Sequence, residues 1–454
     1  FDPFEFVPKY CNNNLGVKPN EVNNAIMKLR GIANRQIGVI ELDHSLDIDE
    51  VTEIFIRINS KGTALSQSVM SKMAADTVHG GNILRKVVDY FCHLAVKPDF
   101  YPQMIKDLEF EKTEFASKIK WLAKDNEDIY NPDYNDMLRV AFMYSFNRAK
   151  LSDLVSLLSG RDFETREFKE EIVEDSYNKL CEGIKVFINE HNFEQFVLAI
   201  KGAGFKSSKQ LNSQMTLDFA YMLYLKLSKD SSIPHDQVKH HVQKWFVLST
   251  LTGRYVGSPE SVMSRDIRLI NEKGFINFFY EIEASVLSDT FWDISLPQNL
   301  ETTSTNSPAF NTFLAAQINL NCNSLFMHGT MISDLINISG DVHHIFPKAY
   351  LKNNGIDTKG RYNQVANFTY LDTQVNKAIS DDAPNIYFQS ALEQCDKKNI
   401  AFGNIFERDA LMKNLSENAI PESIVSMTVE NYDEFLADRR KLMAQLMMRY
   451  YKGL

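Results

Sequence analysis

The spacing of apolar residues between Ile83 and Ser264 limits what this chain can fold into more than any other feature. Stretches such as FEQFVLAIKGAGF (193–205) and QVKHHVQKWFVLSTL (237–251) place apolar residues three or four positions apart. This is the period of an α-helix with one face turned towards a core. No repeat of fixed length occurs, so a solenoid is not favoured. We therefore predict a helical body in a fold that is mainly α, with small α+β parts.

The segments that flank this body have a different pattern. At 454 residues the chain is too long for one ordinary core, so we predict three domains over residues 1–80, 81–295 and 296–454. Their patterns predict a strand at Gln36–Leu42, a helix at Asp47–Ile58, a helix from Gln67 to Thr77 capped by Ser66, a polar linker at Leu296–Pro308, short strands and turns within Asn311–Tyr387, and helices after these.

Composition excludes several classes of protein. No run approaches the ~20 apolar residues that a membrane span needs, and the first residues lack the features of a signal peptide. The five cysteines lie far apart without a CxxC pair, which favours reduced thiols. We therefore expect a cytoplasmic protein without a membrane partner. Because the sequence starts with Phe1 rather than Met, we also expect an N-terminal portion to be missing.

The formal net charge of −10 argues against a protein that coats nucleic acid indiscriminately. It does not exclude a nuclease, because affinity for phosphate groups depends on local patches of charge rather than on the sum.

The segment DVHHIFP (341–347) carries the most chemical information. Adjacent histidines on a strand point to opposite sides, so His343 and His344 can serve one site only where the strand ends or bends. Pro347 is consistent with such an ending, because proline cannot donate to a sheet. The other adjacent pair, His240-His241, lies in a helical pattern without companion residues and is interpreted as structural.

Two further elements are predicted downstream of the histidines. VANFTYL (365–371) alternates as a second strand that contains Asn367, and a short helix can begin at Asp372 or Thr373, with Asn376 in its first turn. The order strand, loop, strand, helix is that of a ββα-metal finger, here over residues 341–384.

These residue types suit hydrolysis of a phosphodiester. His344 fits the general base, because an imidazole with a pKa near neutrality can deprotonate water. His343 and Asn376 fit the ligands of one divalent ion. Asn367 can orient the histidine loop through its amide, and Asp341 can act as a further ligand or support one.

With these residues the chain resembles the HNH, or His-Me finger, nucleases. More narrowly, DVHHIFPKAYL and VANFTYLDTQVNKAISDDAPNIY resemble the nuclease domain of GmrSD-type, modification-dependent restriction enzymes. His344 precedes Asn376 by 32 residues, Asn367 precedes it by nine, and a Pro-x-x-Tyr follows at Pro384–Tyr387, all of which suits that subfamily. The resemblance implies Mg²⁺ or Mn²⁺ as cofactor. His343 is a departure, since an acidic ligand is frequent there, and a nitrogen ligand weakens the preference for Mg²⁺.

A second resemblance lies near the N-terminus. The pattern I-F-x-x-I-N-x-x-G-x-x-L at Ile54–Leu65 is similar to the end of the ParB/sulfiredoxin-like domain of the same enzymes. That domain is associated with nucleotide binding, which implies a possible NTP site with Arg57 and Asn59 as contacts. A loop held by the Asn59 side chain explains the pattern equally well. The Asp-Gly-Gln-Gln-Arg element of the family is absent from the sequence.

Basic residues provide candidate contacts to the DNA backbone. For those in the body, a position on the surface of a helix is an equally good explanation. For those near the finger and those in the C-terminal helix, solvated side chains are the simpler explanation. The candidates are Arg254, Arg265 and Arg268 in the body, Lys348, Lys352, Arg361 and Lys377 near the finger, and Arg439, Arg440, Lys441, Arg449 and Lys452 in the C-terminal helix.

The sequence thus predicts a metal-dependent DNA endonuclease of prokaryotic antiphage restriction that acts on modified foreign DNA, with a homo-oligomer as a possible assembly. Three alternatives stay open: a nickase or RNase of the same fold, a sensor of nucleic acid with an inactive finger, and a purely structural helical scaffold.

Overall fold

A computed structural model of the chain describes residues 3–14, 16–33, 64–124, 129–337 and 342–454. It divides into two compact units, Phe1–Ile54 and Phe55–Leu454. This division differs from the predicted boundaries at residues 80 and 295. The predicted strand and helix near the N-terminus, together with Arg57, Asn59 and Asp341, lie outside the described residues.

The described part of the chain is mainly helical, which confirms the predicted class. In the first unit, α1 (Pro3–Asn13) packs against α2 (Pro19–Ala33). The second unit begins with α4 (Ala64–Ala75), α5 (Gly81–Val96), η1 (Pro98–Phe100), α6 (Tyr101–Met104), α7 (Leu108–Glu111), α8 (Glu114–Lys118), η2 (Lys120–Ala123), α9 (Tyr134–Phe146), α10 (Leu151–Leu158) and α11 (Glu170–Phe187). It continues with α12 (Glu190–Gly202), η3 (Ser208–Gln210), α13 (Gln214–Leu227), η4 (His235–Gln237), α14 (Val238–Thr252), α15 (Pro259–Lys273) and α16 (Phe275–Val286).

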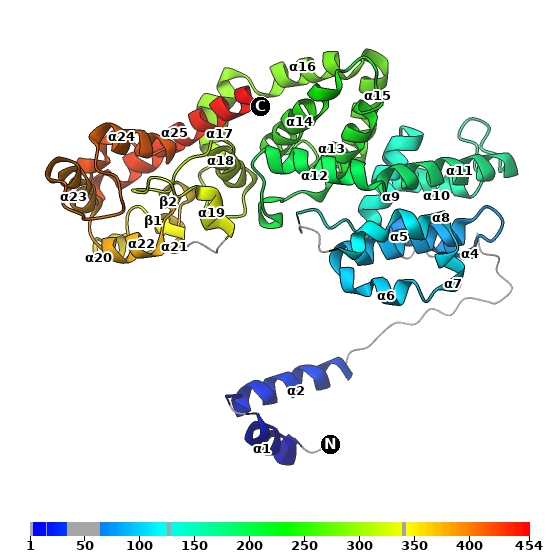
Figure 1. The fold of residues 1–454 in the computed structure, drawn as a ribbon, viewed down its shortest axis with the longest axis horizontal. Helices are drawn as coiled ribbons and strands as arrows, with labels where there is room; N and C mark the ends of the chain where they lie inside the picture. Colours follow the sequence, from blue (N-terminus) through cyan, green and yellow to red (C-terminus); the bar gives the residue numbers. More distant parts are fainter. Residues whose placement is uncertain (1–2, 15, 34–63, 125–128, 338–341) are drawn as a thin grey trace. The chain divides into compact units, whose positions relative to one another are not determined.

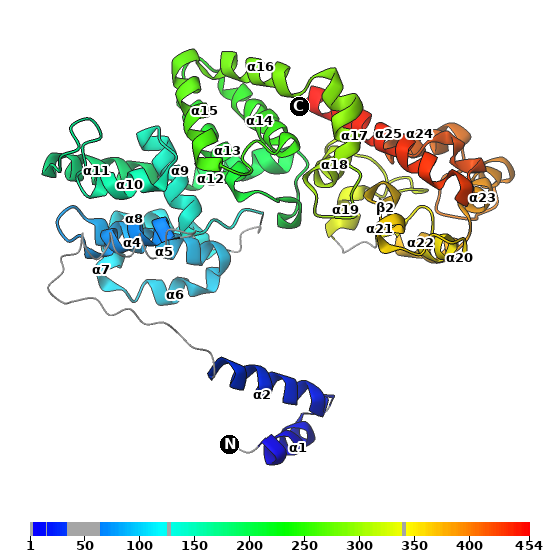
Figure 2. The ribbon, with the colours of Figure 1, turned by 180° about the vertical axis from the view of Figure 1, so that it is seen from behind.

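The elements that follow include those of the predicted finger and the helices around it (Figures 1 and 2). They are η5 (Phe291–Ser295), α17 (Leu296–Asn299), α18 (Pro308–Asn319), α19 (Ile332–Asn337), β1 (Val342–His344), α20 (Lys348–Asn353), α21 (Lys359–Tyr362), η6 (Val365–Asn367), β2 (Phe368–Tyr370), α22 (Thr373–Ile379), α23 (Pro384–Lys397), α24 (Arg408–Glu417), η7 (Glu422–Ser426), η8 (Val429–Asn431) and α25 (Tyr432–Gly453).

Local chemistry explains where several helices start. Ser66, predicted as a cap, lies inside α4, which starts two residues earlier. The start of α9 is a capping box, because Asp133 accepts from the backbone of Asp136 and Asp136 accepts in return. Helix α18 begins with Pro308 after a Ser307 cap, so a helix stands where the sequence predicted short strands. Its residues are buried on all sides, which hides the amphipathic period.

The body and the predicted finger share a core. A single hydrophobic cluster of the described residues extends from Val69 to Leu454. Helix α25 packs along α17 and α18 and reaches η6, just before β2. The hydroxyl of Tyr450 on α25 donates to the carbonyl oxygen of Ala203 at the end of α12. The predicted finger therefore packs against helices that share its core.

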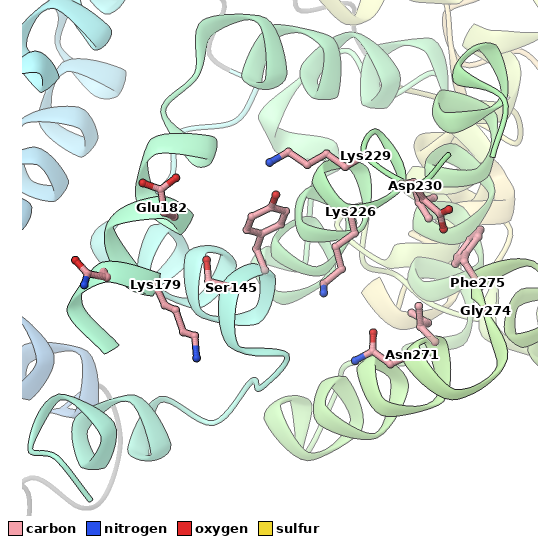
Figure 3. A pocket seen from close by; sticks show the side chains of 13 residues that line it. Ser145, Lys179, Glu182, Lys226, Lys229, Asp230, Asn271, Gly274 and Phe275 are labelled. Carbon is pink, nitrogen blue, oxygen red and sulfur yellow. The ribbon is translucent and has the colours of Figure 1, made fainter. Parts of the chain in front are cut away.

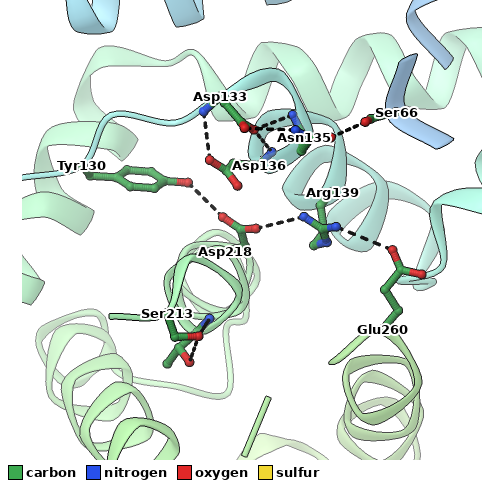
Figure 4. Close-up of polar contacts among 10 residues, drawn as sticks. Ser66, Tyr130, Asp133, Asn135, Asp136, Arg139, Ser213, Asp218 and Glu260 are labelled. Carbon is green, nitrogen blue, oxygen red and sulfur yellow. Dashed lines mark hydrogen bonds and ion pairs between the residues drawn. The ribbon is translucent and has the colours of Figure 1, made fainter. Parts of the chain in front are cut away.

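A polar network is buried between α9 and α13 (Figure 4). Asp218 is fully buried, and its carboxylate lies 3.4 Å from both the Tyr130 hydroxyl and an Arg139 nitrogen. Arg139 also lies 3.6 Å from Glu260 on α15. Burial raises the pKa of Asp218 well above its usual range.

None of the helices in the described part of the chain combines the length and the apolar character of a membrane span.

Candidate active site

The two adjacent histidines lie on a short antiparallel pair of strands. Strand β1 pairs with β2 so that His343 faces Thr369 and His344 faces Phe368. Neighbouring residues of a strand point to opposite faces, and the two rings have different surroundings. His343 is buried, with 5% of its surface exposed, and His344 is half-buried.

His343 contacts Asn376. The Asp372 side chain caps α22 by accepting from the backbone of Gln374 and Val375, and this cap sets Asn376 in the first turns of the helix. The Nδ1 atom of His343 then lies 2.6 Å from Oδ1 of Asn376. Burial lowers the pKa of His343 to about 4, so its ring is neutral at pH 7.

His344 contacts Asn363, a residue that the sequence analysis did not single out. Its Nε2 atom lies 2.9 Å from Oδ1 of Asn363, in the loop between the two strands. The edge of the ring packs against Phe368, with centroids 4.9 Å apart. Burial lowers the pKa of His344, and the positive charge of Lys348 lowers it further, against the opposing effect of the Asn363 bond. Only its position in the loop after the histidines could have indicated Asn363.

The Asn363 contact assigns the nitrogens of His344. An amide oxygen only accepts hydrogen bonds, so Nε2 carries the proton and Nδ1 carries the lone pair. No hydrogen bond to Nδ1 is formed by the residues that the structure describes. The His344 ring therefore presents a free acceptor nitrogen, as a general base must.

Asn367 fastens the loop that follows the histidines. Its fully buried side chain accepts from the backbone of Phe346 at 2.8 Å and donates to the carbonyl oxygens of Phe346 and Tyr362 at 3.0 and 3.3 Å. This is the kind of contact predicted for Asn367. The prediction that Asn367 lies within a strand was wrong, since residues 365–367 form η6 and β2 begins at Phe368.

The pair His343 and Asn376 can hold a divalent cation. At 2.6 Å two lone pairs would repel, so the ring Nδ1 donates a hydrogen bond to the amide oxygen. A divalent cation bound by both atoms would replace this proton and would hold the two atoms further apart, because it lies about 2.0–2.2 Å from each ligand atom. The other ring nitrogen, Nε2, is buried without a hydrogen-bond partner in the described part of the chain, so the ring has an unsatisfied polar atom. Imidazole nitrogen and amide oxygen suit Mn²⁺, whereas Mg²⁺ prefers oxygen.

Further ligands would have to come from elsewhere. Within the described ranges, no group of three His, Cys, Asp or Glu side chains could hold a metal ion. Water and a bound phosphate are the usual remaining ligands in a catalytic site. The donor set thus fits an ion that is shared with substrate.

Three predicted basic residues near the finger lie on its surface. Lys348 and Lys352 both place Nζ 5.4 Å from the ring centre of Tyr362, whose own ring lies 6.5 Å from that of His344. Lys377 is exposed on α22. These lysines can face a phosphate backbone near His344.

Two of the predicted arginines, Arg361 and Arg254, are engaged with carboxylates. Arg361 is paired with Asp433 at 2.8 Å, and both side chains are more than half exposed, so this pair can open at low cost. Arg254 differs. It makes two bonds of 2.7 Å to the buried Asp266 and lies over the Trp245 ring. This geometry gives Arg254 a structural role and does not support the predicted phosphate contact.

The remaining arginines of the body lie on helix α15. Arg265 is 3.5 Å from Asp266, and Arg268 is paired with Glu272 at 2.9 Å. Both are exposed, so the surface interpretation and the phosphate contact stay equally open for them.

Searches for related proteins found no matching family, curated protein or solved structure for this chain. The family resemblance in the sequence therefore stays a prediction.

Proposed function

We propose that this chain is a metal-dependent DNA endonuclease with a His-Me finger over residues 341–384, acting on modified foreign DNA in prokaryotic antiphage restriction. One observation carries the proposal. Two potential ligands from different elements, His343 and Asn376, meet at 2.6 Å beside a neutral histidine whose free nitrogen is available. The order of β1, β2 and α22 along the chain supports it.

In this proposal His344 takes the proton of a water molecule. Asn363 holds Nε2, and Nδ1 accepts the proton as the oxygen attacks phosphorus and the bond to the 3′ oxygen breaks. His343 and Asn376 would hold the ion, which when bound would supply positive charge to the scissile phosphate and the leaving oxygen. Asn367 keeps the chain after His344 in place through its bonds to Phe346.

Local charge explains how an acidic chain would engage DNA. Lys348, Lys352 and Lys377 are cations beside the finger that form no ion pair within the described ranges. Backbone contacts of this kind position a duplex without selecting its sequence. The modified base, an NTP requirement, the oligomer and the cytoplasmic location stay predictions from the sequence.

Cleavage of DNA by the purified chain and its His344→Ala variant tests the proposal. Phage DNA, plasmid DNA and a matched RNA are incubated with Mg²⁺, with Mn²⁺ and with EDTA. We expect cutting of DNA that needs metal and that His344→Ala abolishes. His240→Ala, which alters an exposed histidine of helix α14, is the control and should retain full activity.

A measurement of metal binding distinguishes variants that lose the metal site from variants that lose only the general base. Titration calorimetry with Mn²⁺ should show a site that His343→Ala or Asn376→Ala removes and His344→Ala retains. Cutting of RNA alone would favour the RNase alternative. DNA binding without cutting under any condition would favour the sensor.

A further inference from the structure

An open pocket of about 770 Å³ lies in the helical body, apart from the finger (Figure 3). Its walls come from α9, α11, α13, the end of α15 and the start of α16. The volume is within the range of small-molecule sites. None of the residues proposed for catalysis lines it.

Two lysines give this pocket an uncompensated positive charge. Lys226 is half-buried, and its Nζ contacts only the neutral amide oxygen of Asn147. Burial lowers the pKa of Lys226. Lys229 lies 5.3 Å from the centre of the Tyr144 ring. Among the residues that the structure describes, neither lysine has a carboxylate within ion-pair distance.

The acidic residues of the wall do not balance these two charges. Glu182 lies 3.2 Å from Lys185. Asp230 keeps its negative charge and accepts two bonds from Ser232, at 2.6 and 2.9 Å, but within the described residues it forms no ion pair with either lysine. Lys179, the third lysine of the wall, is already paired with Asp175 at 2.6 Å. An ammonium group that is partly removed from water without a counter-ion is costly, so an anion in this pocket would be stabilised.

The remaining wall suits the body of an organic molecule. Tyr144 and Ile270 offer half-buried apolar side chains, whereas Phe275 is 3% exposed and packs its ring against Trp245. The amides of Asn178 and Asn271 add donors and acceptors, and Figure 3 shows Lys226 and Asn271 on facing elements.

We propose that this pocket binds a small organic phosphate, with the phosphate group at Lys226 and Lys229 and the apolar part against Tyr144 and Ile270. A phosphate group can also belong to nucleic acid. The pocket is bounded by residues of five helices and its volume of about 770 Å³ is that of a small-molecule site, so the small ligand is favoured. The inference is independent of the proposed nuclease activity.

Calorimetry with the full chain tests this site. The probes are inorganic phosphate, ribose 5-phosphate, AMP, adenosine, and a short single-stranded oligonucleotide with and without a 5′-phosphate. The variant Lys226→Met/Lys229→Met removes both charges but keeps the apolar stems. Lys397→Met/Lys441→Met removes two exposed charges of the C-terminal helices and serves as the matched control. Thermal unfolding verifies that each variant folds.

We expect AMP to bind and adenosine not to bind. The pocket variant should weaken AMP binding at least about tenfold, because two charge-assisted contacts are lost, and the control should leave it unchanged. Absence of binding for every phosphate probe would overturn the proposal. So would a pocket variant that binds AMP as tightly as the original chain, or a control variant that loses as much AMP affinity as the pocket variant. Binding of the oligonucleotide alone, with or without its 5′-phosphate, would overturn the small-molecule ligand in favour of nucleic acid.

Discussion

The hydroxyl of Tyr387 donates a hydrogen bond of 2.6 Å to the carbonyl oxygen of Ile345, the residue that follows His344 in the chain. Pro384 begins helix α23, and Tyr387 lies one turn later, fully buried. The spacing Pro-x-x-Tyr therefore has a physical role, because proline sets the start of the helix and the tyrosine fastens the histidine strand to it.

Tyr387→Phe should destabilise the fold. The change leaves the buried carbonyl oxygen of Ile345 without its donor, at a cost of about 1–3 kcal/mol. Urea denaturation measures the free energy of unfolding. Tyr280→Phe, at a tyrosine that is 57% exposed, is the control and should change it little. Equal stability of the Tyr387 variant and the original chain would contradict the importance of this bond.

Asn363→Ala should lower the rate of DNA cleavage strongly while changing the free energy of unfolding less. Without the amide oxygen, Nε2 of His344 loses the partner that fixes the ring and its tautomer. A misplaced general base costs about 10²-fold in rate. Asn363→Asp keeps an oxygen acceptor and should recover part of the rate. Rates of plasmid cleavage in Mn²⁺ provide the measurement, and full activity of the alanine variant would exclude Asn363 as a positioning residue.

Arg439→Ala should be among the most destabilising substitutions in the C-terminal helix. The sequence indicates Arg439 as a candidate phosphate contact, but its side chain is fully buried and donates to the carbonyl oxygens of Ala366 and Asn418 at 2.7 and 3.3 Å. Burial lowers its pKa to about 9. We expect a loss of about 3–5 kcal/mol from the cavity and the two unpaired carbonyls.

Thermal unfolding without DNA measures this effect. The exposed Arg449 on the same helix provides the matched control, since Arg449→Ala should change stability by no more than about 0.5 kcal/mol. Similar melting temperatures for both variants would restore the interpretation of Arg439 as a surface contact.

Asp136→Asn should change how stability depends on pH. Burial raises the pKa of Asp136 to about 7, with a smaller contribution from the charge of Asp133. The folded pKa lies above the ordinary value, so the stabilisation is complete below about pH 4 and is lost as the pH rises through about 7. Each pKa unit corresponds to about 1.4 kcal/mol. The asparagine keeps the acceptor for the Asp133 backbone in the network of Figure 4.

We therefore expect Asp136→Asn to be more stable than the original chain at pH 8 and to lose this advantage near pH 4. Melting temperatures at both pH values test it. Asp107→Asn is the control, because the pKa of Asp107 is shifted in the opposite direction to that of Asp136. A hydrogen bond from Lys86 lowers the pKa of Asp107 to about 2, so its stabilising contribution is constant from pH 8 to 5 and begins to fall only near pH 4. A pH profile of Asp136→Asn parallel to that of the original chain would exclude a neutral Asp136.

The sequence determined the elements of this protein where local chemistry decides them. Apolar periodicity gave the helices between Ile83 and Ser264, since a helix buries one face wherever residues recur at that spacing. The short strands at His343–His344 and at Phe368–Tyr370, and the cap at Asp372, follow from alternation and from a side chain that bonds its own neighbours.

Only the tertiary structure decided which side chains meet. Asn363 is hydrogen-bonded to His344, 19 residues away in the sequence, and Arg439 to Ala366, 73 residues away. Arg254 is paired with the buried Asp266. No local rule predicts these pairs, because a lysine or arginine on a helix has the same sequence signature whether its face meets water or a neighbouring element. Packing decides between the two, since a buried charge or amide persists only where the surrounding backbone supplies its hydrogen bonds.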